Sequence, residues 1–116
     1  MLGSQPFFIL DLDDLEKGWA TSDAKMPTAR GGVVSGTVGK KIYVLGGEGN
    51  TAEESDGIFD EIEVFDTVKE SWESVGKMSL PRHGGQAVAV KGGIYLPGGG
   101  ISEGGSPVQT LDVYWL

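Results

Sequence analysis

The stretch Ile42-Tyr43-Val44-Leu45-Gly46-Gly47 is repeated later in the chain, with small changes, as Ile94-Tyr95-Leu96-Pro97-Gly98-Gly99. The two copies begin 52 positions apart, and the same separation relates Arg30 to Arg82. Self-similarity at a period of this size is typical of repeat architectures, in which one unit of a few strands buries its apolar face only against a neighbouring unit. The sequence therefore predicts a tandem of similar supersecondary units.

Each repeat has the pattern of short strands joined by tight turns. Polar and apolar residues alternate over 61–66 and again over 71–75, which predicts two half-buried strands. Glycine at the Gly39-Lys40 and Lys91-Gly92 positions predicts the turns of two hairpins. The segment 98–107 is predicted as a loop, and no segment has a sustained helical period, so the expected fold class is all-β.

Composition excludes several classes of function. The chain carries 9 Lys and Arg against 17 Asp and Glu, a net charge of −8 with no basic cluster, which predicts neither nucleic acid nor an anionic membrane as a partner. The absence of cysteine excludes disulfides, thiolate nucleophiles and zinc–thiolate sites. The apolar run near the start, 6–10, is too short for a membrane span or a signal-peptide core, so a cytoplasmic location is the default expectation.

The phased residues resemble the kelch repeat of β-propellers. The first copy has Met26-Pro27, Arg30, the stretch 42–47, Val64-Phe65-Asp66 and then Trp72. The second copy runs from Met78 and Arg82 through 94–99 to Val113-Tyr114, while Leu10-Asp11 with Trp19 is similar to the tail of a preceding repeat. The resemblance covers residues 7–116 and is to a bacterial-type kelch protein or a fragment of one.

In kelch proteins each repeat forms one four-stranded antiparallel blade. The resemblance implies two such blades: 27–77 forms blade 1, and 78–116 forms blade 2 without its outer strand. Residues 7–26 are expected to form outer strands of a partial blade, and 1–6 a disordered N-terminus.

Two blades do not close a ring, because propellers use about 4 to 8. Exposed faces at both ends predict head-to-tail homo-oligomerisation into a closed propeller. A trimer with six blades is the favoured expectation, with the Trp19 strand of each chain completing the last blade of its neighbour by strand exchange. The strand at 7–12 has no place in that scheme. The alternative is that the chain is a fragment of a longer propeller.

Candidate ligand-binding residues lie in loops and linkers that the kelch plan places on one face of the ring, the funnel face. They are Arg30, Arg82, His83, Glu48, Asn50 and Glu103. The recurrence of arginine in both repeats favours a structural role, in which each guanidinium satisfies backbone carbonyls. The single histidine, His83, is expected to be a solvated loop residue. One histidine without cysteine does not make a usual transition-metal site, so no metal or cofactor is predicted.

Two further motifs are interpreted as structural and not as ligand-binding. The stretch 47–52 matches a loose dinucleotide fingerprint but lacks the helix and βαβ unit that such a site needs. The acidic segment 48–63 lacks the EF-hand spacing and is expected to form a solvated rim.

The predicted function is a non-catalytic kelch-type binding module that recognises a protein segment or a small glycan at the funnel face. The resemblance leaves an alternative, a metal-independent sugar epimerase or mutarotase. In that case Arg82 and His83 would meet a carboxylate such as Glu48 or Glu103 from another blade. No catalytic residue is assigned, because spacing alone does not identify an acid–base pair.

Overall fold

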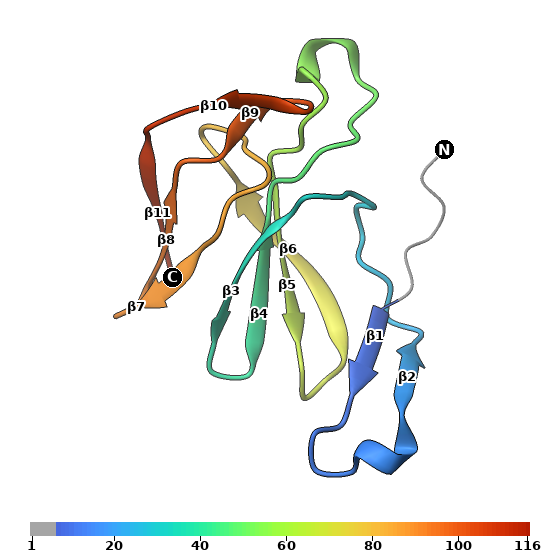
Figure 1. Ribbon diagram of the computed structural model, residues 1–116. Coiled ribbons are helices and arrows are strands. Elements are labelled where there is room, and N and C mark those ends of the chain that lie inside the picture. Colours follow the sequence, from blue (N-terminus) through green and yellow to red (C-terminus); the bar gives the residue numbers. More distant parts are fainter. Residues whose placement is uncertain (1–6) are drawn as a thin grey trace.

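The computed structural model describes residues 7–116 and confirms an all-β fold (Figure 1). The N-terminal segment expected to be disordered, 1–6, lies outside the described residues. All strand pairings in 7–116 are antiparallel. The described part of the chain contains no helix long and apolar enough to span a membrane.

Blade 1 is a four-stranded sheet with its strands in chain order. Its members are β3 (Val34–Val38), β4 (Lys41–Leu45), β5 (Glu61–Asp66) and β6 (Ser71–Lys77). The alternating pattern of β5 places Phe65 beside Trp72 in the register with β6. The four-stranded antiparallel sheet that the repeat pattern predicts is thus confirmed.

Blade 2 has three strands within 7–116, ordered β11 (Leu111–Trp115), β8 (Gly93–Pro97) and β7 (Val88–Val90). Pro97 is the last residue of β8, as expected of a residue that cannot donate to a ladder. The prediction of a plain loop over 98–107 is wrong, because this segment contains a hairpin of β9 (Gly100–Ser102) and β10 (Gly105–Pro107). Its tight turn uses Gly104, whose φ of 79° suits glycine.

The N-terminal hairpin joins β1 (Phe7–Leu10) to β2 (Trp19–Ser22) through the short 3-10 helix η1 (Leu15–Lys17). The ring of Phe7 lies 4.4 Å from that of Phe65 and 5.8 Å from that of Trp72, between centroids. The Trp72 indole N–H also donates to the Ala24 carbonyl at 3.1 Å. The hairpin therefore forms a layer against blade 1, and the strand that had no place in the sequence scheme is the partner of the Trp19 strand.

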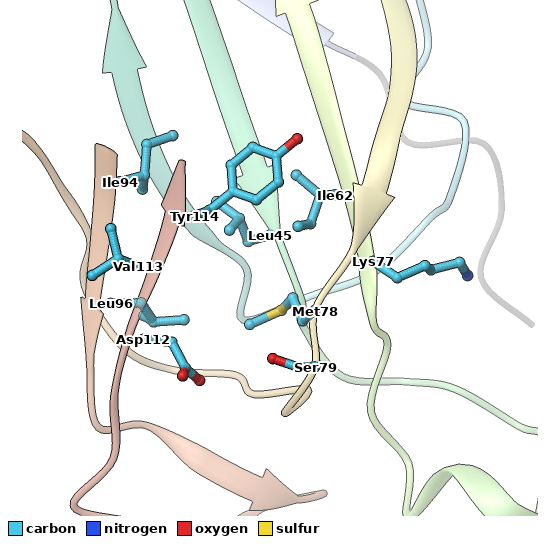
Figure 2. A pocket seen from close by; sticks show the side chains of 10 residues that line it. All are labelled: Leu45, Ile62, Lys77, Met78, Ser79, Ile94, Leu96, Asp112, Val113 and Tyr114. Carbon is cyan, nitrogen blue, oxygen red and sulfur yellow. The ribbon is translucent and has the colours of Figure 1, made fainter. Parts of the chain in front are cut away.

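The core lies between the two blades, where Leu45, Ile62 and Ile94 are almost fully buried. Figure 2 shows these side chains around a small cavity of about 70 Å³ at this seam, with Met78 and Tyr114 at its wall. Each blade thus buries one apolar face against the other, as expected for repeat units, and blade 1 buries its second face against the hairpin.

Candidate functional site

Loops from both blades gather at one end of the sheets, opposite the 39–40 turn (Figure 1). We define the loop face as residues 46–60, which include the 3-10 helix η2 (Glu53–Ser55), together with 83–85 and 98–108. Backbone bridges stabilise these loops, pairing Glu48 with Gly31 and Ile58, and His83 with Gly100. The loop face is therefore a hydrogen-bonded surface built on both blades.

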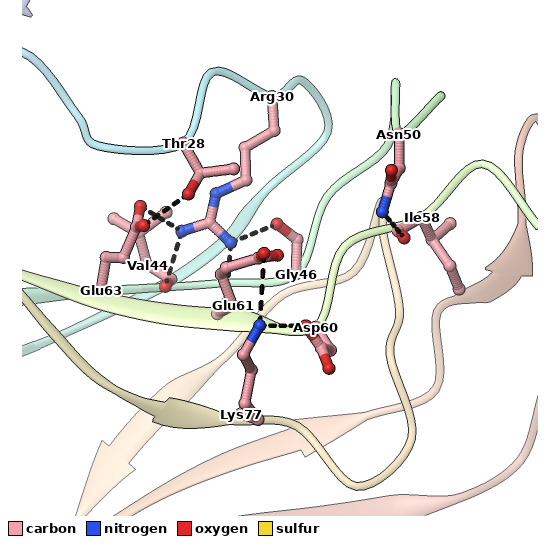
Figure 3. Close-up of polar contacts among 10 residues, drawn as sticks. All are labelled: Thr28, Arg30, Val44, Gly46, Asn50, Ile58, Asp60, Glu61, Glu63 and Lys77. Atoms are coloured by element: carbon pink, nitrogen blue, oxygen red, sulfur yellow. Dashed lines mark hydrogen bonds and ion pairs between the residues drawn. The ribbon is translucent and has the colours of Figure 1, made fainter. Parts of the chain in front are cut away.

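The Arg30 side chain stabilises the backbone at the loop-face end of blade 1 (Figure 3). Arg30 is only 4% exposed, and its guanidinium forms an ion pair with Glu63 at 2.9 Å. It also donates to three carbonyl oxygens, those of Val44 (3.3 Å), Gly46 (2.7 Å) and Glu61 (2.7 Å). Burial lowers the pKa of Arg30, while the neighbouring carboxylates of Glu63 and Glu61 oppose that shift.

Arg82 bonds in the same way to the backbone at the loop-face end of blade 2, and it is 0% exposed. It pairs with Asp112 and donates to the carbonyl oxygens of Leu96 (3.4 Å), Gly98 (2.8 Å) and Thr110 (2.8 Å). The Val44 and Leu96 carbonyls, like those of Gly46 and Gly98, are again 52 positions apart. The forked guanidinium matches several carbonyls at once, which a single ammonium does not. Both arginines thus bond to backbone carbonyls, as the structural role expected from their recurrence requires. Direct contact of either arginine with a ligand stays a prediction.

His83 is only 9% exposed, so the expectation of a solvated histidine is wrong. The unforeseen β9–β10 hairpin accounts for this, since the Ser102 carbonyl oxygen lies 2.7 Å from His83 Nε2. A carbonyl only accepts, so Nε2 carries a proton and donates it to Ser102. Nδ1 faces the Glu48 carboxylate at 3.6 Å.

Glu48 connects the loops of the two blades. One of its carboxylate oxygens faces His83 and also accepts from the Gly104 amide at 3.0 Å. The Glu103 amide donates to the Asp56 carbonyl at 2.9 Å. Glu48 thus contacts His83 and the tip of the β9–β10 hairpin, whereas Glu103, at the same tip, contacts the blade 1 loop at Asp56.

Asn50 lies in the blade 1 loop, where both ends of its amide are used. Its side-chain NH₂ donates to the Ile58 carbonyl at 2.9 Å (Figure 3), and its oxygen accepts from the Ala52 amide at 3.1 Å. These bonds fix the loop shape. Any contact between Asn50 and a ligand remains a prediction.

A polar groove of about 340 Å³ lies beside Asn50. Its wall includes Glu54, Asp56, Ile58, Asp60 and Pro81. Sequence reasoning identified the acidic segment but not the groove, because the groove needs Pro81 from the linker to blade 2. Among residues 7–116, no three His, Cys, Asp or Glu side chains are grouped as a metal would require. The loop face presents carboxylates beside one imidazole, which suits hydrogen-bond donors and positive charge.

Comparison with known proteins defines the class. Residues 29–79 match the kelch motif, and the chain belongs to the kelch-repeat family. It is 43% identical over 96 residues to a Kelch-like protein, terF, of Aspergillus terreus, covering 83% of this chain and 21% of that protein. It is 39% identical over 83 residues to N-acetylneuraminate epimerase of Vibrio cholerae (67% and 21%) and 30% identical over 82 residues to human Kelch-like protein 25 (71% and 13%). The chain thus spans about a fifth or less of the length of these relatives.

Proposed function

We propose that this chain is a non-catalytic protein-binding module that holds a segment of a partner protein on its loop face. The observation that carries the proposal is that Glu48 of blade 1 contacts both His83 and the Gly104 amide at the tip of the β9–β10 hairpin, which joins loops from two blades into one surface. Loops fixed on a rigid scaffold are where binding sites usually lie. The kelch-type fold supports an interaction role, since its blades supply a rigid scaffold for such loops.

The chemistry of the loop face favours a segment rich in hydrogen-bond donors or positive charge. Glu54, Asp56 and Asp60 line the groove, and Glu103 lies at the tip of the adjacent hairpin. The buried arginines act as positioning residues in this proposal, because their N–H groups fix the carbonyls from which the loops start.

We also propose that copies of the chain associate into a ring, as the sequence led us to expect. A trimer requires the Trp19 strand to become the fourth strand of a neighbour's blade 2. In the structure this strand is already paired with β1, and the hairpin lies on blade 1 as a layer of its own. Because this strand is already paired, the arrangement favours a ring of fewer than three copies.

The second candidate function is a sugar epimerase or mutarotase. The observation that favours it is the similarity to N-acetylneuraminate epimerase, together with a carboxylate 3.6 Å from an imidazole nitrogen. The geometry favours binding, because His83 Nε2 already donates to Ser102. Proton NMR of N-acetylneuraminate with the purified chain separates the two: we expect anomer exchange at the uncatalysed rate, and faster exchange abolished in His83→Ala would establish the enzyme.

Selection from a displayed library of random 12-residue peptides tests the binding function. We expect enriched peptides to bind the chain and to lose about tenfold or more in affinity against Glu54→Ala or Glu103→Ala. The matched control is Glu73→Ala, an exposed carboxylate on β6, which should bind as wild type does. Equal losses in the control, or enrichment only of glycans on a parallel array, would contradict a protein segment as the ligand.

A further inference from the structure

Blade 2 exposes an apolar surface on the side away from blade 1. In β11, Tyr114 packs toward blade 1, with its ring 6.2 Å from that of Tyr43. The alternate residues point the other way, and Leu111 and Trp115 are 57% and 63% exposed. We define the C face as Leu111, Val113 and Trp115 together with Tyr95, whose ring lies 5.9 Å from that of Trp115.

The N-terminal hairpin exposes a second apolar surface at the opposite end of the molecule. Phe7 packs on blade 1, so strand alternation directs Phe8 and Leu10 to the other side. Leu10 pairs with Trp19 in the register of β1 and β2. Phe8 and Trp19 are 56% and 68% exposed. We define the N face as Phe8, Leu10 and Trp19.

The N face and the C face lie at the two ends of a stack of three layers, which are the hairpin, blade 1 and blade 2. The hairpin lies on the Phe65 side of blade 1, and blade 2 lies on the opposite, Tyr43 side. Inside the chain, one seam packs the hairpin against the Phe65 side of blade 1, and the other packs the Tyr43 side of blade 1 against blade 2. The N face and the C face are the two unmatched members of this series within 7–116. The two faces lie at opposite ends of the part of the chain that the structure describes.

We propose that the C face of one chain docks on the N face of a second copy, head to tail. This proposal rests on the self-association proposed above and names its surfaces and its partner. Both faces belong to the outer half of their layers: β11 is the outermost strand of blade 2 in 7–116, and the hairpin pairs the strands that the kelch plan places outermost. Aromatic and aliphatic side chains then meet across the new seam, as Phe7, Phe65 and Trp72 do inside the chain.

The layer count sets the number of copies. Each chain supplies three layers, the hairpin, blade 1 and blade 2, within the described residues. Two chains supply six layers, of which four are blades and two are two-stranded hairpins, and this lies within the usual range of about 4 to 8 blades. A pair closed head to tail contains two identical seams, and a rotation that closes avoids open filaments.

Paired face-blocking variants test the docking by light scattering on a sizing column. Trp19→Glu blocks only the N face and Trp115→Glu only the C face. Both side chains are exposed, so the fold should persist, and circular dichroism checks this. Val68→Glu, 67% exposed in a turn outside both faces, is the matched control. Wild type and Val68→Glu should elute at two chain masses, and each tryptophan variant at one, with affinity weakened about 30-fold or more.

An equal mixture of Trp19→Glu and Trp115→Glu should regain pairing through one seam, because the intact C face of the first variant meets the intact N face of the second, while the other seam carries both substitutions. A monomeric wild type, a tryptophan variant that still pairs alone, or a mixture that stays monomeric would overturn the proposal. Peptide binding by monomeric Trp19→Glu gives a separate readout. If that variant binds and wild type never pairs, only the docking fails; if pairing holds and no peptide binds the loop face, only the proposed function fails.

Discussion

Gly46 and Gly98 occupy equivalent positions in the two repeats and share a φ of 65°, but their surroundings differ. A Cβ on Gly46 would overlap the Arg82 carbonyl oxygen and come within 3.1 Å of the Met78 sulfur. A Cβ on Gly98 would approach only the Val108 carbonyl, at 3.3 Å. The first glycine therefore permits a close approach between blades, and the second mainly permits the backbone conformation.

Alanine at these two glycines should have unequal effects. Gly98→Ala should destabilise the fold by about 1–2 kcal/mol, the cost of a left-handed conformation for an L-residue. Gly46→Ala carries that cost plus an overpacking cost of about 1–3 kcal/mol. Urea unfolding followed by circular dichroism measures both, and equal losses would contradict the close contact at Gly46.

Arg82→Lys should destabilise the chain although charge is retained. Lysine has no planar fork to reach the Leu96, Gly98 and Thr110 carbonyls while pairing with Asp112. We expect a loss of about 3 kcal/mol or more in the free energy of unfolding, because buried groups lose partners. Lys77→Ala, which removes an exposed ion pair with Asp60, is the control and should change the unfolding midpoint little. A comparable loss in both variants would contradict the role assigned to Arg82.

At the scale of elements, the seam between the blades is sensitive to alkaline pH. Burial raises the pKa of the Tyr114 phenol above its ordinary value of 10.0, with a smaller contribution from Tyr43. The folded state therefore favours the neutral phenol, which donates to the Val75 carbonyl at 3.3 Å. This stabilisation is present below pH 10 and is lost as the pH rises through the folded-state pKa.

Tyr114→Phe should flatten the alkaline part of the stability profile. Between pH 8 and pH 11, the free energy of unfolding should fall more steeply in wild type than in the variant, because only wild type must ionise a half-buried phenol whose pKa is raised in the folded state. At pH 8 the two proteins should differ only by the lost hydrogen bond, about 1 kcal/mol. Parallel profiles over this range would show that Tyr114 does not carry the effect.

Most strands were predictable from sequence, whereas one important hairpin was not. Alternation and turn glycines identify β3 to β6, but the expectation that the strand over 61–66 is half-buried is wrong, because β5 lies between the N-terminal hairpin and blade 2 and is buried on both sides. The β9–β10 hairpin has only three residues a strand and no apolar alternation, since it covers His83 rather than a core. Its existence depends on backbone bonds to the linker, such as His83 N–H to the Gly100 carbonyl at 3.0 Å, which local patterns do not encode.

At the scale of the whole molecule, the sequence predicted repeats but not how its ends are arranged. The 52-residue period identifies the arginines and the loops that start beside them. The contacts of Glu48 with His83 and with Gly104 depend on the two blades lying side by side, and Glu48 and Gly104 are 56 positions apart. The layer formed by β1 and β2 likewise follows from aromatic packing of Phe7 on Phe65.

The proposed binding of a partner segment to the loop face can be located by mapping the chemical shifts of backbone amides. A selected 12-residue peptide is titrated into the ¹⁵N-labelled chain, and the shifts of backbone amides are followed. Our account predicts that the largest shifts fall in 48–60, at His83 and in the β9–β10 hairpin, and that they vanish in Glu103→Ala at the same peptide concentration. Shifts concentrated on the strands β6 and β11, with the loop face unchanged, would contradict it.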